Sequence, residues 1–238
     1  MNQIREREKM MVKIFSMAFI FLLSILISPP AVPAENAEEA KPPIEKEQKK
    51  ITSDTEKKAY EIFDEILTLT ETSDIKTVLP QIEALYLRII KEYPDTALAQ
   101  ESYWRLVLLY VDKYTPPEYE KAENLYSEFL KKYPGSVIRN LIEDTLSKSY
   151  YKNEKWDRLS KLYSYVVKEF GEKGKLSNPN PMFMYAEAKF NLGDLAEAEK
   201  AYKIIIEQFP TSGRATTAKA RLEDIKNRKG KADVPPVK

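Results

Sequence analysis

Apolar residues recur along this chain at intervals of three, four, three and four residues, a spacing that places them on one face of an α-helix. The clearest copy lies in residues 193–210, where Pro210 ends the helix because proline cannot donate a backbone hydrogen bond. Three more copies lie upstream, and we call the four sets ladders. The ladders are Leu79, Ile82, Tyr86, Ile89 and Tyr93; Tyr119, Ala122, Tyr126, Phe129 and Tyr133; Trp156, Leu159, Tyr163, Val166 and Phe170; and Leu195, Ala198, Tyr202, Ile205 and Phe209.

The residues that follow the ladders set the length of a repeat. Pro94, Pro134, Gly171 and Pro210 lie 40, 37 and 39 residues apart. Two helices and two turns fit this period, and each helix pair must stack on its neighbours to bury its apolar face. The sequence therefore predicts an all-α fold, an α-solenoid of helix pairs over residues 57–228, closed by a capping helix from Arg214 to about Lys226.

Local signals predict where these helices begin and end. Thr96, Ser136 and Ser212 each come two residues after a proline, where a hydroxyl group can cap the next helix. Gly193 suits a left-handed C-cap. Gly171 is expected to end the third ladder helix, and the first helix is expected at about residues 55–70.

The N-terminus has the features of an export signal. Four basic residues precede an uncharged, mostly apolar run at residues 14–28, and residues 32–34 offer a cleavage site. We expect residues 1–34 to be a signal peptide and the protein to be periplasmic. The alternative is an uncleaved segment, residues 14–28, that anchors the protein in the inner membrane. Residues 35–56 are predicted to be a disordered charged linker, and residues 229–238 a disordered basic tail.

Composition removes several classes of function. The chain has no cysteine and no histidine, which excludes nucleophiles, metal sites and disulfides built from these residues. The carboxylates, lysines and tyrosines follow no catalytic motif, so we expect no enzyme activity, no cofactor and no metal. The net charge is +1 in 238 residues, which gives no electrostatic signature for nucleic acid.

The ladders resemble the tetratricopeptide repeat (TPR) family. Ala198, Tyr202 and Pro210 match its pattern of alanine, aromatic residue and proline, as do Ala122, Tyr126 and Pro134. Residues 193–195 are similar to its inter-helix turn, and residues 105–110 to its first helix. The long repeats resemble an exported branch that includes proteins of the BamD type and CpoB. Ile82 and Leu159 depart from the pattern at the alanine position.

The resemblance implies that the first helix of each pair lines a concave groove that binds a protein or peptide partner, in envelope assembly or secretion. The groove positions are Trp104, Leu108 and Asp112; Asp144, Lys148, Tyr151 and Lys152; and Phe183, Glu187, Phe190 and Asn191. For Trp104, Tyr151 and Phe190 the alternative is packing between adjacent helices. Lys148 and Lys152 either hold a partner's carboxylate or form a solvated face.

A second function hypothesis comes from the 15 tyrosines together with the basic C-terminal tail. Tyr86, Tyr126 and Tyr163 belong to ladders and are assigned to the core. Exposed tyrosines could instead stack on the sugars of peptidoglycan or another envelope polysaccharide. The candidates for that surface are Tyr114, Tyr119, Tyr150 and Tyr165.

Overall fold

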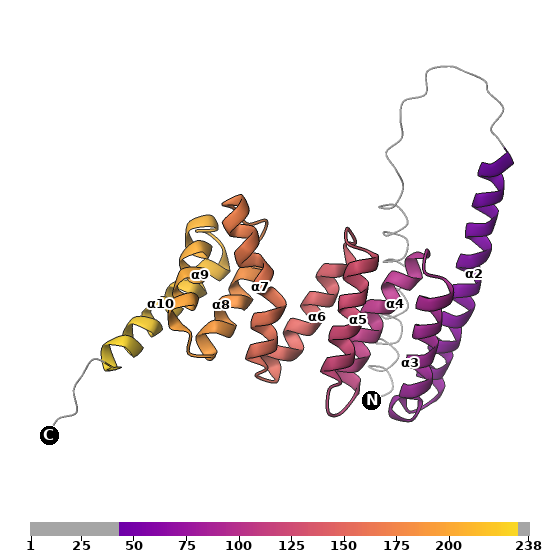
Figure 1. Ribbon diagram of the computed structural model, residues 1–238. Coiled ribbons are helices and arrows are strands. Elements are labelled where there is room, and N and C mark those ends of the chain that lie inside the picture. The colour runs from indigo at the N-terminus through magenta and orange to yellow at the C-terminus, as the bar shows by residue number, and fades with distance from the viewer. Residues whose placement is uncertain (1–42, 233–238) are drawn as a thin grey trace, which may run out of the picture. The chain divides into compact units, whose positions relative to one another are not determined.

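A computed structural model describes residues 43–232 of the chain, with side chains described for residues 54–228 (Figure 1). All regular secondary structure in this part is helical, which confirms the predicted all-α fold of stacked helix pairs. The elements are α2 (Pro43–Thr72), α3 (Ile75–Glu92), α4 (Ala97–Leu108), the π-helix η1 (Leu109–Lys113), α5 (Tyr119–Lys132), α6 (Ile138–Lys152), α7 (Trp156–Lys173), α8 (Asn180–Asn191), α9 (Leu195–Gln208) and α10 (Gly213–Ala232).

The four ladders form the buried faces of α3, α5, α7 and α9. The three central positions of every ladder are buried, while the aromatic residue that ends each ladder is half-buried. Tyr86, Tyr126 and Tyr163 lie in the core, as predicted. Tyr202 and Ile205 in α9 are fully buried. The ladder spacing therefore identifies the packing face of the second helix in each pair.

The predicted hydroxyl caps are present. The amide of Ala99 donates to Thr96 Oγ1 at 3.2 Å, and the amide of Ala215 donates to Ser212 Oγ at 3.1 Å. Ser136 Oγ accepts the amide of Ile138 at 3.2 Å. These bonds satisfy amide groups that the first turn of a helix leaves without a partner.

Glycine ends two helices through a left-handed backbone. Gly193 follows α8 with φ 83°, as predicted. The prediction for Gly171 was wrong, because α7 continues through it to Lys173. Gly174, with φ 66°, is the actual C-cap of α7. A glycine inside a helix is tolerated at a cost of about 1 kcal/mol, so the ladder's end did not define the helix's end.

The first and last helices are longer than predicted. Helix α2 begins at Pro43 rather than near residue 55, so it includes part of the predicted linker. Helix α10 continues to Ala232, beyond the expected end near Lys226. The predicted signal peptide, residues 35–42 of the linker and residues 233–238 of the tail lie outside the described residues. Within residues 43–232, no helix combines the length and apolar character needed to cross a membrane.

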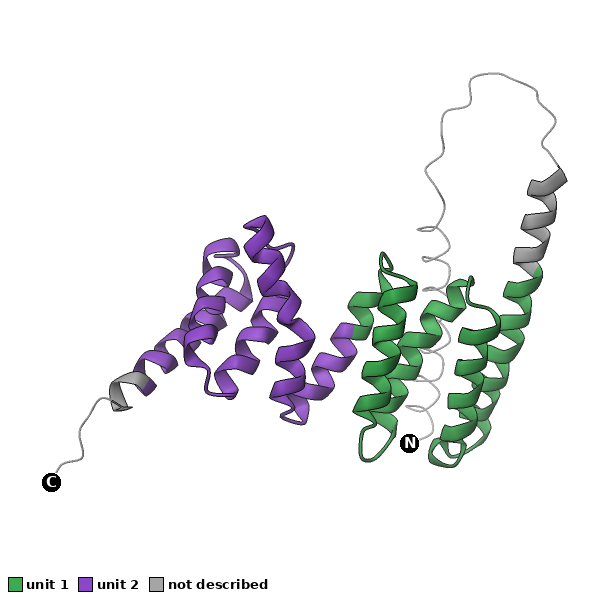
Figure 2. Cartoon of the chain, in the orientation of Figure 1, with its two compact units in different colours: residues 1–142 green, residues 143–238 purple. Residues whose placement is uncertain are grey.

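The chain divides into two compact units, residues 1–142 and residues 143–238 (Figure 2). In unit 1, α3 packs against both α2 and α4, and α5 packs against α4. Its core includes Ile66, Ile82, Ile89, Leu98 and Leu106. In unit 2, the order of packing is α7, α8, α9 and α10. Its core includes Leu146, Tyr150, Leu159, Met182 and Tyr202.

Candidate functional site

Helix α4 gives unit 1 a candidate contact surface. Trp104 is half-buried, and Leu108, one turn later, is 37% exposed. The π-helix that follows places Asp112 in solvent, where it pairs with Lys113 at 2.7 Å. All three groove positions predicted for unit 1 thus remain accessible, and two of them combine large apolar side chains at adjacent turns.

A buried ion pair orders the residues next to Trp104. Glu101 is 1% exposed, and Arg105 Nε donates to its Oε1 at 2.6 Å. Burial raises the pKa of Glu101, although the Arg105 charge opposes this shift. The Arg105 guanidinium also lies over two rings, 5.3 Å from the centroid of Phe63 and 5.7 Å from that of Trp104. The indole of Trp104 therefore contacts the Arg105 side chain, which the hydrogen bond to Glu101 holds in place.

A second carboxylate fixes the end of α4 and the π-helix. Glu83 of α3 accepts hydrogen bonds from Tyr110 Oη at 2.9 Å and Tyr114 Oη at 2.5 Å. Lys121 of α5 pairs with the same carboxylate at 3.4 Å and lies over both tyrosine rings. Burial alone would raise the pKa of Glu83, but the tyrosine hydrogen bonds and the Lys121 charge together lower it. One acidic side chain thus connects α3, η1 and α5.

Helix α6 supplies the predicted positions of unit 2. Asp144 and Lys148 are exposed and pair with each other at 2.5 Å, which is the arrangement of a solvated helix face. Lys152 is also exposed. Tyr151 is 40% exposed, its ring meets Trp156 edge-on at 5.2 Å, and its hydroxyl donates to Glu187 Oε2 at 3.3 Å. Tyr151 is therefore an accessible aromatic side chain held in one orientation.

The prediction fails for three positions of α8. Phe183 is 4% exposed, Glu187 is 1% exposed and Phe190 is 2% exposed, so a partner cannot reach them. The physical reason is that α8 packs against α7 and α9 and also contacts α10, whose arginines lie over both phenyl rings. Asn191 remains exposed, with Nδ2 donating to the backbone oxygen of Glu187 at 2.8 Å.

Glu187 is the centre of a buried network in unit 2. Tyr202 Oη donates to its Oε1 at 2.6 Å, and Arg221 donates to both carboxylate oxygens at 2.9 Å. This bidentate pair joins α8 to α10, and the hydrogen bond with Glu187 raises the pKa of Arg221. The sequence placed Glu187 in the groove, and its burial and its pairing with Arg221 were not predicted. The signal available was a glutamate on the apolar face of α8, which requires a partner when buried.

The tyrosines proposed for sugar stacking do not form such a surface. Tyr119 is 8% exposed and Tyr150 is 1% exposed, so both belong to the core. Tyr114 and Tyr165 are half-buried, and their hydroxyls donate to Glu83 and Glu143, respectively. Two of the four candidate tyrosines are therefore excluded from a sugar-stacking surface.

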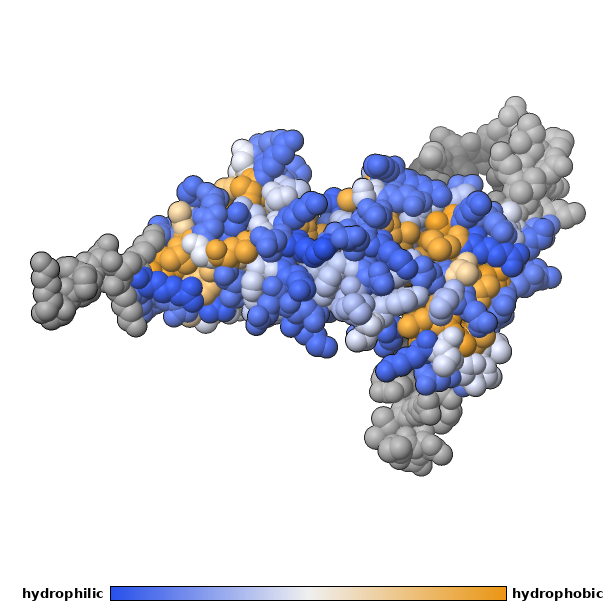
Figure 3. All heavy atoms as spheres, turned by 60° about the horizontal axis from the view of Figure 1, so that its bottom comes forward, coloured by the Kyte–Doolittle hydropathy of each residue, from blue (hydrophilic) through white to orange (hydrophobic). Residues whose placement is uncertain are grey.

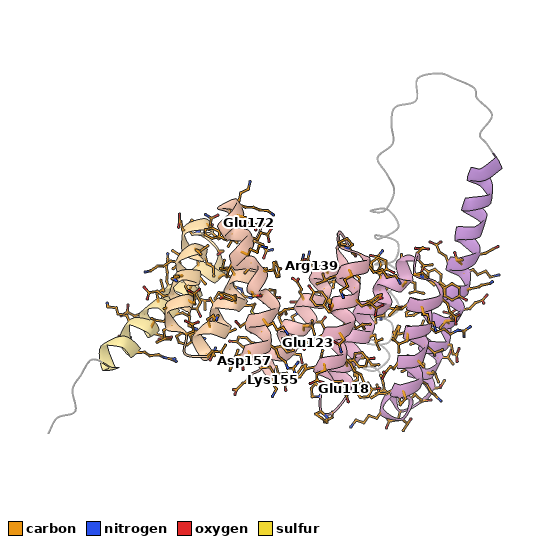
Figure 4. All side chains as sticks on the ribbon, in the orientation of Figure 1. Glu118, Glu123, Arg139, Lys155, Asp157 and Glu172 are labelled. Atoms are coloured by element: carbon orange, nitrogen blue, oxygen red, sulfur yellow. The ribbon has the colours of Figure 1, made fainter. Side chains whose placement is uncertain are left out.

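Hydrophilic residues cover most of the face shown in the space-filling view, and hydrophobic residues show through in several areas (Figure 3). Charged residues also occupy the ends of the second helices. At α7, the N-cap residue Lys155 and Asp157 lie at one end and Glu172 at the other, all exposed to solvent (Figure 4). The large hydrophobic side chains that stay exposed among the described residues are Leu87, Leu108, Val137, Tyr151 and Leu192. Leu108 and Tyr151 belong to the predicted binding positions.

Unit 1 also has a hollow of about 400 Å³ that the sequence did not indicate. Its lining residues come from α2 and the end of α3 and carry charges of both signs: Lys58, Glu61, Ile62, Glu65, Arg88 and Tyr93. Among the described residues, no cluster of acidic side chains is arranged to hold a metal ion.

Matches come from the solved structures and from the protein-family models. The chain is similar to a solved tetratricopeptide repeat protein from Parabacteroides merdae ATCC 43184, at 15% identity and a TM-score of 0.48. The match covers 71% of this chain and 60% of that protein, so this chain spans less than two thirds of its length. The curated proteins contain no significant match.

A family model also matches part of the chain. The match falls on α8, α9 and the turn before α10, which is the region with the most regular ladder. Tetratricopeptide repeat proteins are generally non-enzymatic scaffolds for protein–protein interaction. The likeness to the BamD and CpoB branch stays a prediction. Residues 182–212 match the model of the tetratricopeptide repeat family.

Proposed function

We propose that this protein is an exported scaffold that binds a protein or peptide partner through the exposed side chains of its first helices, in cell-envelope assembly or secretion. The observation that carries the proposal is the pair Trp104 and Leu108 on α4. These side chains remain accessible although the residues around them are ordered by the buried Glu101–Arg105 pair.

Accessible aromatic side chains on a rigid support suit partner binding. Large aromatic residues contribute strongly to interfaces, and a side chain fixed before binding loses little conformational entropy on association. Tyr151 provides the same combination in unit 2, through its contact with Trp156 and its hydrogen bond to Glu187. The two units thus each offer one ordered aromatic side chain next to charged residues.

Export is supported by the N-terminal sequence. The basic residues, the uncharged run at residues 14–28 and the small residues at 32 and 34 follow the order of a signal peptide. Cell fractionation with mass spectrometry of the mature N-terminus tests this part. We expect a periplasmic chain that begins after residue 34, whereas a membrane fraction retaining residues 14–28 would indicate the anchored form.

Pull-down from cell extract tests the binding surface. We expect Trp104→Ala and Leu108→Ser to reduce the yield of captured partner while the helical circular dichroism spectrum stays unchanged. Leu87→Ser is the matched control, because Leu87 is a similarly exposed leucine of unit 1 on α3. If the α4 variants and the control capture the same amount, the surface assignment is wrong.

A further inference from the structure

Helix α10 carries arginines at every seventh position, on one face. Arg214, Arg221 and Arg228 are separated by two helical turns each, and we call this set the arginine row. Two aromatic residues of α8, Phe183 and Phe190, have the same spacing of seven residues. The two helices therefore place cations and rings in matching positions.

Each guanidinium of the row lies over a phenyl ring. The distance to the ring centroid is 4.4 Å from Arg214 to Phe183, 4.9 Å from Arg221 to Phe190 and 4.1 Å from Arg228 to Phe190. Contacts of this kind orient the planar group and leave its N–H edges available for a carboxylate. Both rings are buried, whereas Arg214 is half-exposed and Arg228 is exposed.

The three arginines of the row differ in whether their charge is already paired with a carboxylate. Arg221 is paired with the buried Glu187, and its Nη1 lies 3.5 Å from Asp224. Arg214 Nε donates to the neutral side chain of Asn180 at 2.9 Å. Arg228 is exposed and has no acidic partner among the described residues. Two of the three guanidiniums thus keep donors and positive charge for a ligand.

The row is continuous with the accessible tyrosine of unit 2. Tyr151 and Arg221 share the carboxylate of Glu187, so the middle of the row lies beside an exposed aromatic ring. From end to end the row spans 14 residues of helix, or about 21 Å at a rise of about 1.5 Å per residue. An extended peptide of about six or seven residues covers the same length at about 3.3 Å per residue.

We propose that the arginine row binds an acidic segment of a protein partner, with aspartate or glutamate side chains accepting hydrogen bonds from Arg214 and Arg228. This inference rests on the proposed scaffold function and specifies the chemistry of the partner for unit 2. Asp224 is the acidic group beside the row, and its carboxylate competes with the ligand. Glu187 is buried and already neutralised by Arg221.

A fluorescein-labelled peptide of eight glutamates, added to the purified chain, tests the proposal by fluorescence anisotropy. A neutral serine–glycine peptide of equal length is the ligand control. We expect the double variant Arg214→Gln/Arg228→Gln to bind the acidic peptide about tenfold more weakly, as the loss of two charge-assisted contacts implies. Asp224→Asn should bind it more tightly, because the competing carboxylate is removed.

The matched control is Lys219→Gln/Lys226→Gln, which removes the same charge from the same helix. These lysines are exposed and lie on the opposite side of α10 from the row. We expect this variant to keep the parent affinity within about twofold, since exposed charges away from a contact contribute little. If both double variants lose affinity equally, or the parent chain does not bind the peptide at 0.1 M salt, the row is not a binding site.

The arginine row and the α4 surface can be tested independently. Arg228→Gln alone tests the row if the double variant unfolds, because Arg228 has no ion-pair partner to lose among the described residues. A chain that captures a partner through Trp104 but ignores the acidic peptide would overturn the row alone. A chain that binds the acidic peptide but captures no partner through α4 would overturn the proposed binding surface and leave the row intact.

Discussion

Units 1 and 2 both contain a buried glutamate paired with an arginine, but the two pairs connect different parts of the chain. In unit 1, Glu101 and Arg105 lie four residues apart in α4, so the pair is formed within one helix. In unit 2, Glu187 and Arg221 lie 34 residues apart and join α8 to α10. The first pair supports a side chain on the surface, whereas the second holds the terminal helix in place.

The two pairs also differ in the exposure of the aromatic residues next to them. Arg105 lies next to Trp104 and leaves the indole accessible. Arg221 joins α10 to α8, where Arg221 lies over Phe190 and Arg214 lies over Phe183, and both rings are buried. The same chemical pair thus lies beside an accessible aromatic residue in one unit and beside buried aromatic residues in the other.

The largest effect is expected for Tyr202→Ala in unit 2. Tyr202 is fully buried and also donates to Glu187, so its loss leaves a cavity and removes a hydrogen bond. We expect unit 2 to be destabilised by about 3–5 kcal/mol. The chain has two tryptophans, Trp104 in unit 1 and Trp156 in unit 2, so urea unfolding followed in the Trp104→Phe background reports on unit 2 alone. A parent-like midpoint would show that the ladder is misplaced.

Arg221→Gln should have the next largest effect, again confined to unit 2. It leaves Glu187 buried without its cation, which costs about 2–3 kcal/mol because Arg221 itself is partly reached by water. Hydrogen exchange should show lost protection in α10 and unchanged protection in α3 to α5. Equal loss of protection in both units would contradict a local role for this pair.

Arg105→Gln should cost less, about 1–2 kcal/mol, because its pair lies within one helix and Glu101 can take up a proton. The raised pKa of Glu101 makes that protonation easier than for an exposed glutamate. We expect the fluorescence emission maximum of Trp104, measured in the Trp156→Phe background, to shift to longer wavelength, because the indole becomes more exposed to water. An unchanged spectrum would mean that Arg105 does not order Trp104.

The smallest effect is expected for Glu83→Gln, and it depends on pH. Because the folded-state pKa of Glu83 is lowered below its ordinary value of 4.5, its contribution to the stability of unit 1 is complete above about pH 4.5. That contribution is lost as the pH falls through the lower folded-state value. The difference in thermal midpoint between parent and variant should therefore shrink from pH 6 to pH 3. A constant difference would exclude the ionised carboxylate as its cause.

The sequence predicted those features that depend on local order. Ladder spacing identified the buried faces of α3, α5, α7 and α9, because helical periodicity decides which residues share a face. Hydroxyl caps followed from residues two positions after a proline. Binding positions were less predictable, since exposure depends on neighbouring helices. Trp104 stays accessible, but Phe190 is covered by arginines from a helix that begins 23 residues later.

In-cell photo-cross-linking tests the central claim, that the exposed side chains of the first helices bind a partner. A photoreactive amino acid is placed at position 104 or 108 on α4, at position 151 on α6, and at position 87 on α3 as the control, and cross-linked proteins are identified by mass spectrometry. We expect positions 104, 108 and 151 to capture the same envelope protein and position 87 not to capture it. Capture at position 87 alone, or equal capture at all four positions, would contradict it.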